Sequence, residues 1–174
     1  MNGEKPKFYE ANAANLIQPS TQNNVPEPRL DHLYQEVILD HNRNPRNFKE
    51  LSNPTLYSHG VNPLCGDDYH IYVDVAGGNI IKDVGFKGSG CAISKSSASI
   101  MTTMIKGKTL DQAAKLEADV LQLLTEENVS PAIRENSGRM VIFDGVKEFP
   151  VRVKCATLAW HALGDALKDA GKGA

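Results

Sequence analysis

A pattern typical of paired β-strands occupies the segment Ile71-Tyr72-Val73-Asp74-Val75-Ala76-Gly77-Gly78-Asn79-Ile80-Ile81-Lys82-Asp83-Val84-Gly85-Phe86. Its first part places apolar residues at every second position, which is the period of a β-strand. Gly77-Gly78-Asn79 is typical of a tight turn, and the β-branched residues that follow favour a second strand. The stretch therefore predicts an antiparallel β-hairpin.

Helical patterns flank this hairpin on both sides. Apolar residues recur at helical spacing from Leu30 to His41, and Pro45 ends that pattern. The segment between Pro45 and Cys65 is predicted to be a loop, and 140–143 is left open between a strand and a core segment. Four further helical segments are predicted, which begin at Cys91, after the cap Thr109, after the cap Ser130, and at Cys155. These elements predict an α+β fold, a small antiparallel β-sheet packed by helices.

Length and composition are those of one globular domain. The chain has 174 residues, of which 41% are hydrophobic and 23% charged. Residues 1–29 are rich in Asn and Pro and lack apolar periodicity, so they are predicted to be a disordered polar tail. Residues 30–174 are predicted to form a single domain.

Charge and hydropathy exclude several classes of function. A formal net charge of −2 argues against general binding of nucleic acid or of an anionic membrane. No apolar run approaches the roughly 18–20 residues that cross a bilayer, and the start of the sequence lacks the apolar core of a signal peptide. We expect a soluble, cytoplasmic protein.

The three cysteines, Cys65, Cys91 and Cys155, fit a disulfide framework poorly because one must remain unpaired. Each taken alone is compatible with a buried, inert thiol. Cys91 and Cys155 are predicted at helix N-termini, where backbone N–H groups and the helix dipole favour the thiolate and lower the thiol pKa. Arg152 and Lys154 add positive charge beside Cys155 and are expected to act in the same direction.

Cys65-Gly66-Asp67 places a sulfur and an oxygen ligand two residues apart, and Gly66 allows the backbone to bend between them. Three thiolates and a carboxylate suit Zn²⁺ and also iron. Asp68 competes with Asp67 on spacing alone, and the tripeptide is also compatible with a plain turn.

The five histidines show no paired spacing and are interpreted as surface or core residues.

Four segments together resemble the U-type iron–sulfur cluster assembly proteins, the family of IscU and the N-terminal domain of NifU. Their order and spacing extend the resemblance from about Leu30 to Ala170, and it implies a SufE/NifU-like fold. The segments are Leu33-Tyr34-Gln35-Glu36-Val37-Ile38-Leu39-Asp40-His41, Asn62-Pro63-Leu64-Cys65-Gly66-Asp67, Phe86-Lys87-Gly88-Ser89-Gly90-Cys91-Ala92-Ile93-Ser94 and Val151-Arg152-Val153-Lys154-Cys155-Ala156-Thr157-Leu158-Ala159-Trp160.

Within that family the chain looks like the SufU branch. Lys154 stands where scaffold-type members have a histidine, and the interval from Cys91 to Cys155 is longer than in those members. The resemblance implies a Zn²⁺ ion held by Cys65, Asp67, Cys91 and Cys155. It also implies a SufS-type cysteine desulfurase as partner.

The leading hypothesis is a zinc-dependent acceptor and relay of persulfide sulfur, acting with the desulfurase and downstream cluster-assembly proteins rather than as a stand-alone enzyme. Cys65 is expected to leave the ligand set and accept the sulfur, and Arg152 to steer the anionic persulfide or to hold a zinc ligand. The alternative is a scaffold on which a [2Fe-2S] cluster is built, which loss of the histidine disfavours. A structural zinc module is a third hypothesis, although such sites are usually closed sets of Cys and His.

Overall fold

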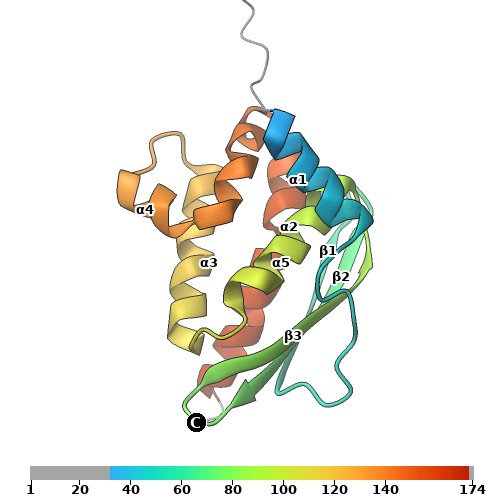
Figure 1. Ribbon diagram of the computed structural model, residues 1–174, viewed down its shortest axis with the longest axis vertical. Helices are drawn as coiled ribbons and strands as arrows, with labels where there is room; N and C mark the ends of the chain where they lie inside the picture. Colours follow the sequence, from blue (N-terminus) through green and yellow to red (C-terminus); the bar gives the residue numbers. More distant parts are fainter. Residues whose placement is uncertain (1–31, 173–174) are drawn as a thin grey trace, which may run out of the picture.

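The structure is a computed structural model that describes residues 32–172. The predicted tail, residues 1–29, lies outside the described residues. In chain order the elements are α1 (His32–Arg43), β1 (Leu56–Asn62), β2 (Asp67–Ala76), β3 (Ile80–Ser89), α2 (Ala92–Ile105), α3 (Leu110–Thr125), α4 (Pro131–Asn136), the 3₁₀ segment η1 (Gly138–Glu148) and α5 (Pro150–Lys172). The α+β prediction is confirmed (Figure 1).

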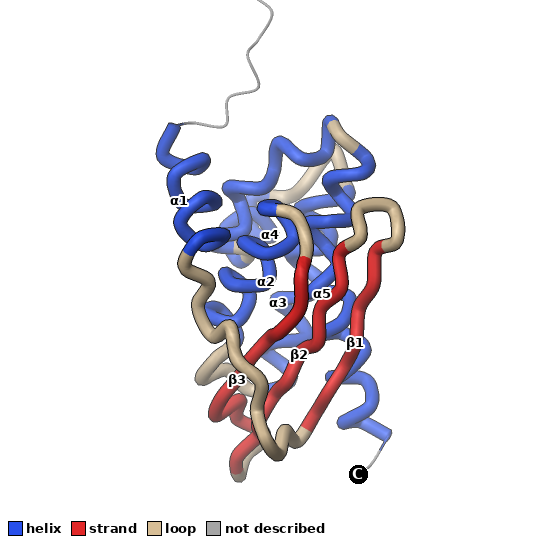
Figure 2. Tube along the Cα trace, turned by 90° about the vertical axis from the view of Figure 1, so that its right-hand side faces the viewer, coloured by secondary structure: helices blue, strands red, loops and turns tan. Residues whose placement is uncertain are grey.

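The sheet has three antiparallel strands in the order β1-β2-β3 (Figure 2). The predicted hairpin is its β2–β3 half. Gly78 and Asn79 turn the chain with positive φ angles of 79° and 57°, which glycine and asparagine tolerate better than other residues. The predicted turn is therefore confirmed.

Strand β1 corrects the prediction that the chain reaches Cys65 through a loop. It pairs with β2 from Leu56↔Val73 to Asn62↔Asp67. The apolar alternation that signals a strand is missing because three of its four less exposed residues, Ser58, Gly60 and Asn62, are small or polar. A Cβ at Gly60 would lie 3.2 Å from both Ala162 Cβ and Leu158 Cδ1, so α5 approaches too closely for a large side chain there.

The helices pack against one face of the sheet, and the other face, called the open face, is covered only in its lower part, where the loop between α1 and β1 crosses it (Figure 2). Helix α5 contacts β1, α2 and α3, and α1 packs against α2. The core lies between these layers, and its largest fully buried side chains include Trp160, Tyr69, Phe86 and Phe143. Among residues 32–172, no helix is both long enough and apolar enough to cross a membrane.

Several local predictions are also confirmed. Thr109 and Gln112 form a capping box at the start of α3, and Ser130 caps α4 with Pro131 in its first turn. The undecided segment 140–143 is part of the 3₁₀ segment η1, where Met140, Ile142 and Phe143 are buried. It is thus a core segment and not a strand.

Candidate metal centre

One turn, one strand and two helices bring the predicted ligands to one end of the sheet. Cys65 lies in the turn between β1 and β2, and Asp67 is the first residue of β2. Cys91 is the N-cap of α2, as predicted. Cys155 lies on α5, whose N-terminal part reaches the same end of the sheet.

The sulfur atoms of Cys65 and Cys155 are 3.0 Å apart, with the Cys155 thiol donating to Cys65. Ligand atoms of Cys65, Asp67 and Cys155 all lie within 4.8 Å of one another. Cys91 is outside that mutually close set, yet its thiol interacts with Cys155. Cys155 is buried, whereas Cys65 and Cys91 are partly exposed.

The carboxylate of Asp67 is fully buried and accepts several hydrogen bonds. Its Oδ1 accepts from the Cys91 backbone N–H at 2.8 Å and from the Ser94 hydroxyl at 2.9 Å. Its Oδ2 accepts from the Asn62 amide at 3.3 Å. Burial alone would raise the pKa of Asp67, but hydrogen bonds from Cys91, Cys155, Ser94 and Asn62 outweigh it and hold the pKa below its usual value. Asp67 is therefore a pre-formed anion.

Helix α2 begins against this carboxylate. Cys91 has an extended backbone, and its sulfur accepts from the Ser94 N–H at 3.5 Å. The N–H groups of Cys91 and Ser94, which have no partner within the helix, thus bind the Asp67 carboxylate and the Cys91 sulfur. The positive end of the helix dipole favours negative charge on both acceptors. Asp67 and Cys91 are held side by side by the same helix start.

The prediction for Cys155 is wrong in two respects. Helix α5 begins at Pro150, so Cys155 lies in its second turn and its thiol is 3.4 Å from the carbonyl oxygen of Val151. Burial, followed by the hydrogen bonds with Cys65 and Asp67, raises the pKa of the Cys155 thiol instead of lowering it. Arg152 and Lys154 are exposed and are not among the groups that shift it.

The structure separates the two competing carboxylates. Asp67 is at the cysteines, whereas Asp68 is directed to the open face of the sheet and contacts His59. Gly66, between Cys65 and Asp67, has a φ of +69°. This left-handed conformation is strained for residues with a side chain and explains a glycine here.

Sequence reasoning missed four residues that support the site: Asn62, Tyr69, Gly90 and Ser94. A Cβ at Gly90 would lie 2.6 Å from Asp67 Oδ1 and 2.7 Å from the Tyr69 hydroxyl, so only glycine leaves room for them. Burial raises the pKa of Tyr69 to about 12 and keeps this phenol neutral. Ser94 was the most accessible of the four from sequence, because it stands three residues after a helix cap, where capping partners lie.

These residues fit a divalent cation. Two thiols and a carboxylate converge, and the Cys91 thiol lies beside them. The negative charges that these groups carry when ionised repel one another, which is why the neighbouring Cys91 contributes to the raised pKa of Cys155. A cation at the point of convergence removes that repulsion. Sulfur and carboxylate oxygen are ligands that Zn²⁺ accepts.

The sequence profile of the NifU-like N-terminal domain matches residues 33–156. Because this match covers more than half of the chain, the protein belongs to that family. Over 144 residues it is 39% identical to the zinc-dependent sulfurtransferase SufU of Bacillus subtilis, covering 82% of this chain and 95% of that protein. It is also 37% identical over 140 residues to the iron–sulfur cluster assembly scaffold protein IscU of Streptococcus pyogenes, with 80% and 86% of the two chains covered.

The fold is shared with a solved structure from Fervidobacterium islandicum AW-1, described as a candidate iron–sulfur cluster assembly scaffold for the SUF system. The two superpose with a TM-score of 0.71 at 31% identity, over 79% of this chain and 98% of the other. The resemblance noted from the four sequence segments is thus confirmed at the level of family and fold.

Proposed function

We propose that this protein acts in iron–sulfur cluster assembly as an acceptor of persulfide sulfur from a SufS-type cysteine desulfurase, and that Cys65, Asp67, Cys91 and Cys155 bind Zn²⁺. The observation that carries the proposal is the 3.0 Å contact between Cys65 and Cys155 beside the buried Asp67 carboxylate. The name of the Bacillus subtilis relative, a zinc-dependent sulfurtransferase, supports it.

The metal's contribution follows from the donor set. Bound Zn²⁺ would keep the thiols in the thiolate form and offset their mutual repulsion. The protein's own groups prepare this state, since hydrogen bonds from Cys91 and Ser94 orient the Asp67 carboxylate before any ion binds.

Cys65 is the best placed of the three thiols to receive sulfur. It is partly exposed and lies in a turn, next to Gly66. Cys155 is buried within a helix, and Cys91 is fixed at a helix start. A ligand on a short turn can move outward without disturbing a helix, so Cys65 can leave the ligand set while Asp67, Cys91 and Cys155 remain.

The transfer is a thiol–disulfide exchange. The Cys65 thiolate attacks the outer sulfur of the desulfurase persulfide and forms a new S–S bond. The S–S bond of the donor breaks, and the donor cysteine leaves as a thiolate with the electron pair. No external oxidant or reductant is needed. Cys65 then carries a persulfide, which downstream cluster-assembly proteins receive.

Two exposed cations precede Cys155. Arg152 and Lys154 lie in the first turns of α5, three residues and one residue before Cys155. Their positive charge favours the approach of an anionic persulfide. We therefore assign Arg152 and Lys154 a steering role and no role in lowering a thiol pKa.

A cluster scaffold is the second candidate. The names of the Streptococcus pyogenes and Fervidobacterium relatives favour it, and a [2Fe-2S] cluster would use the same cysteines and Asp67. The two candidates differ in outcome, because a relay leaves sulfur on one thiol and a scaffold leaves a cluster on several.

Alanine formation by a SufS-type desulfurase tests the relay. Zinc-loaded wild-type protein should stimulate it, and Cys65→Ala should abolish the stimulation. Metal analysis of the same samples shows whether zinc remains in the variant. If wild type gives no stimulation, or Cys65→Ala stimulates equally, the relay is wrong. A stable and transferable cluster after anaerobic reconstitution would favour the scaffold instead.

A further inference from the structure

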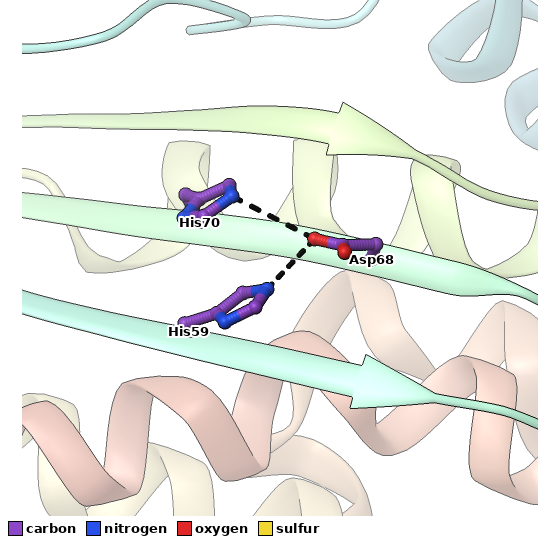
Figure 3. Close-up of side chains that lie close together, drawn as sticks. All are labelled: His59, Asp68 and His70. Carbon is purple, nitrogen blue, oxygen red and sulfur yellow. Dashed lines mark hydrogen bonds and ion pairs between the residues drawn. The ribbon is translucent and has the colours of Figure 1, made fainter.

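A second cluster of metal-ligating side chains lies on the opposite face of the sheet. His59 on β1 and Asp68 and His70 on β2 turn toward one another there (Figure 3). His59 and His70 are direct partners in the antiparallel register, and Asp68 is two residues before His70 on the same strand face. Strand pairing alone thus assembles two imidazoles and a carboxylate.

The ligand atoms of this cluster all lie within 4.8 Å of one another. His59 Nε2 is 2.8 Å and His70 Nε2 3.6 Å from the same oxygen, Asp68 Oδ1. The two imidazole rings are parallel, with centroids 4.3 Å apart. The three side chains are between 37% and 48% exposed. Small rotations of such exposed side chains can reach the metal–ligand distances of about 2.0–2.2 Å that zinc requires.

Tyr57 supports His70 from the side away from Asp68. Its hydroxyl oxygen is 2.6 Å from His70 Nδ1. When Nδ1 carries the ring proton and donates it to Tyr57, the lone pair of His70 is on Nε2, the nitrogen nearest Asp68. Metal-binding histidines are commonly held in this way by an oxygen on their second nitrogen.

We propose that His59, Asp68 and His70 form a second metal site, which binds a divalent first-row transition metal ion such as Zn²⁺ or Fe²⁺. Two nitrogen ligands disfavour Mg²⁺ and Ca²⁺, which take oxygen ligands, and the lack of a thiolate disfavours Cu⁺. Three protein ligands on an open surface leave positions for water, so the ion is exchangeable and not structural.

Lys87, the cation paired with His70 in the sheet, is directed away from the cluster. Its ammonium group lies over the Phe48 ring, 4.4 Å from the centroid. The site shares no ligand with the cysteine centre, since Asp67 and Asp68 point to opposite faces of β2. The proposal therefore does not depend on the sulfur relay.

Metal titration of the full-length protein tests the site. Protein already loaded with one equivalent of Zn²⁺ is titrated with Zn²⁺, and separately with Fe²⁺ under anaerobic conditions, while imidazole nitrogens are followed by NMR. In wild type, a further equivalent should bind in at least one arm, and the Nε2 signals of His59 and His70 should shift. The arm that responds identifies the ion.

Variants assign the ligands. His59→Ala and His70→Ala should each lose the further equivalent, and Tyr57→Phe should weaken it by roughly 10–100-fold. His161→Ala removes an exposed histidine on α5, away from the cluster, and should bind like wild type. Cys65→Ala should keep the histidine site, which separates this proposal from the cysteine centre.

Two results overturn the assignment. One is that wild type binds no further equivalent of either ion. The other is that His59→Ala and His70→Ala still bind it with unchanged affinity.

Discussion

Asp67 and Asp68 are neighbours at the start of β2, and their carboxylates lie on opposite faces of the sheet. The first is buried among the cysteines, and the second is 48% exposed between two histidines. The alternation of side chains along a strand produces this separation. Two candidate metal centres thus lie on opposite faces of the sheet, and β2 contributes a carboxylate to each.

Asp67→Asn should remove most of the zinc affinity of the cysteine centre. Asparagine keeps the size and can still accept from Cys91, but it lacks the negative charge. We expect an affinity loss of at least about 10–100-fold, which is typical when only a supporting group of a metal site is changed. Competition with a chelator measures it. Asp68→Asn is the matched control and should retain the zinc of the cysteine centre.

Gly90→Ala should destabilise the protein and disturb the centre. The added Cβ would lie 2.5 Å from the Ser94 hydroxyl and 2.6 Å from Asp67 Oδ1. Overpacking of this kind costs about 1–3 kcal/mol, measurable by urea denaturation. Gly77→Ala, in the β2–β3 turn with nothing within 4 Å of its added Cβ, is the control. Equal stability of the two variants would contradict the packing assigned to Gly90.

Thiol labelling of metal-free, folded protein should distinguish the cysteines by exposure. Cys65 and Cys91 are partly exposed, whereas Cys155 is fully buried. An alkylating reagent should therefore modify Cys155 last, and mass spectrometry of the digested protein gives the order. Addition of Zn²⁺ should slow modification of all three. Early modification of Cys155 would show that this end of α5 opens readily.

Stability should fall in mild acid because of His41. This side chain is 1% exposed and contacts the Ser99 hydroxyl at 2.7 Å. Burial, with Arg46 and Arg139 nearby, lowers the pKa of His41 from 6.5 to about 4, although Asp40 acts in the opposite direction. The unfolded chain thus binds more protons between these values. Stability contributed by neutral His41 is complete above about pH 6.5 and is lost as the pH falls toward 4, by up to about 3 kcal/mol.

Urea denaturation at several pH values measures this loss. In His41→Asn, which can still bond to Ser99, the decline between pH 6.5 and 4 should be shallower than in wild type. Parallel declines in the two proteins would mean that other groups are responsible.

The sequence was sufficient for the β2–β3 hairpin, the helix caps and the position of Cys91, because each depends on local patterns. It was insufficient for β1, since Ser58 and Gly60 face α5 and hide the apolar alternation. The same omission concealed the histidine cluster. His59 and His70 are eleven positions apart in the chain, and only the pairing of β1 with β2 makes them neighbours.

Cys155 shows a second limit of the same reasoning. Positive neighbours in sequence suggested an acidic thiol, but Arg152 and Lys154 point to solvent, and burial beside Cys65 and Asp67 dominates. Likewise, the support of Asp67 by Asn62 and Ser94 depends on tertiary packing. The residues that meet at this end of the sheet were accessible from motifs and the family resemblance, whereas the electrostatics of the site were not.

The turn that carries Cys65 sets a limit on how partners can meet this protein. Residues 63–66 are anchored at both ends by the Asn62↔Asp67 pair. Four residues span at most about 14 Å when fully extended, so the middle of an anchored turn can travel only about half of that. Cys65 therefore has a short reach. A sulfur donor must bring its own cysteine on a protruding segment to this end of the sheet.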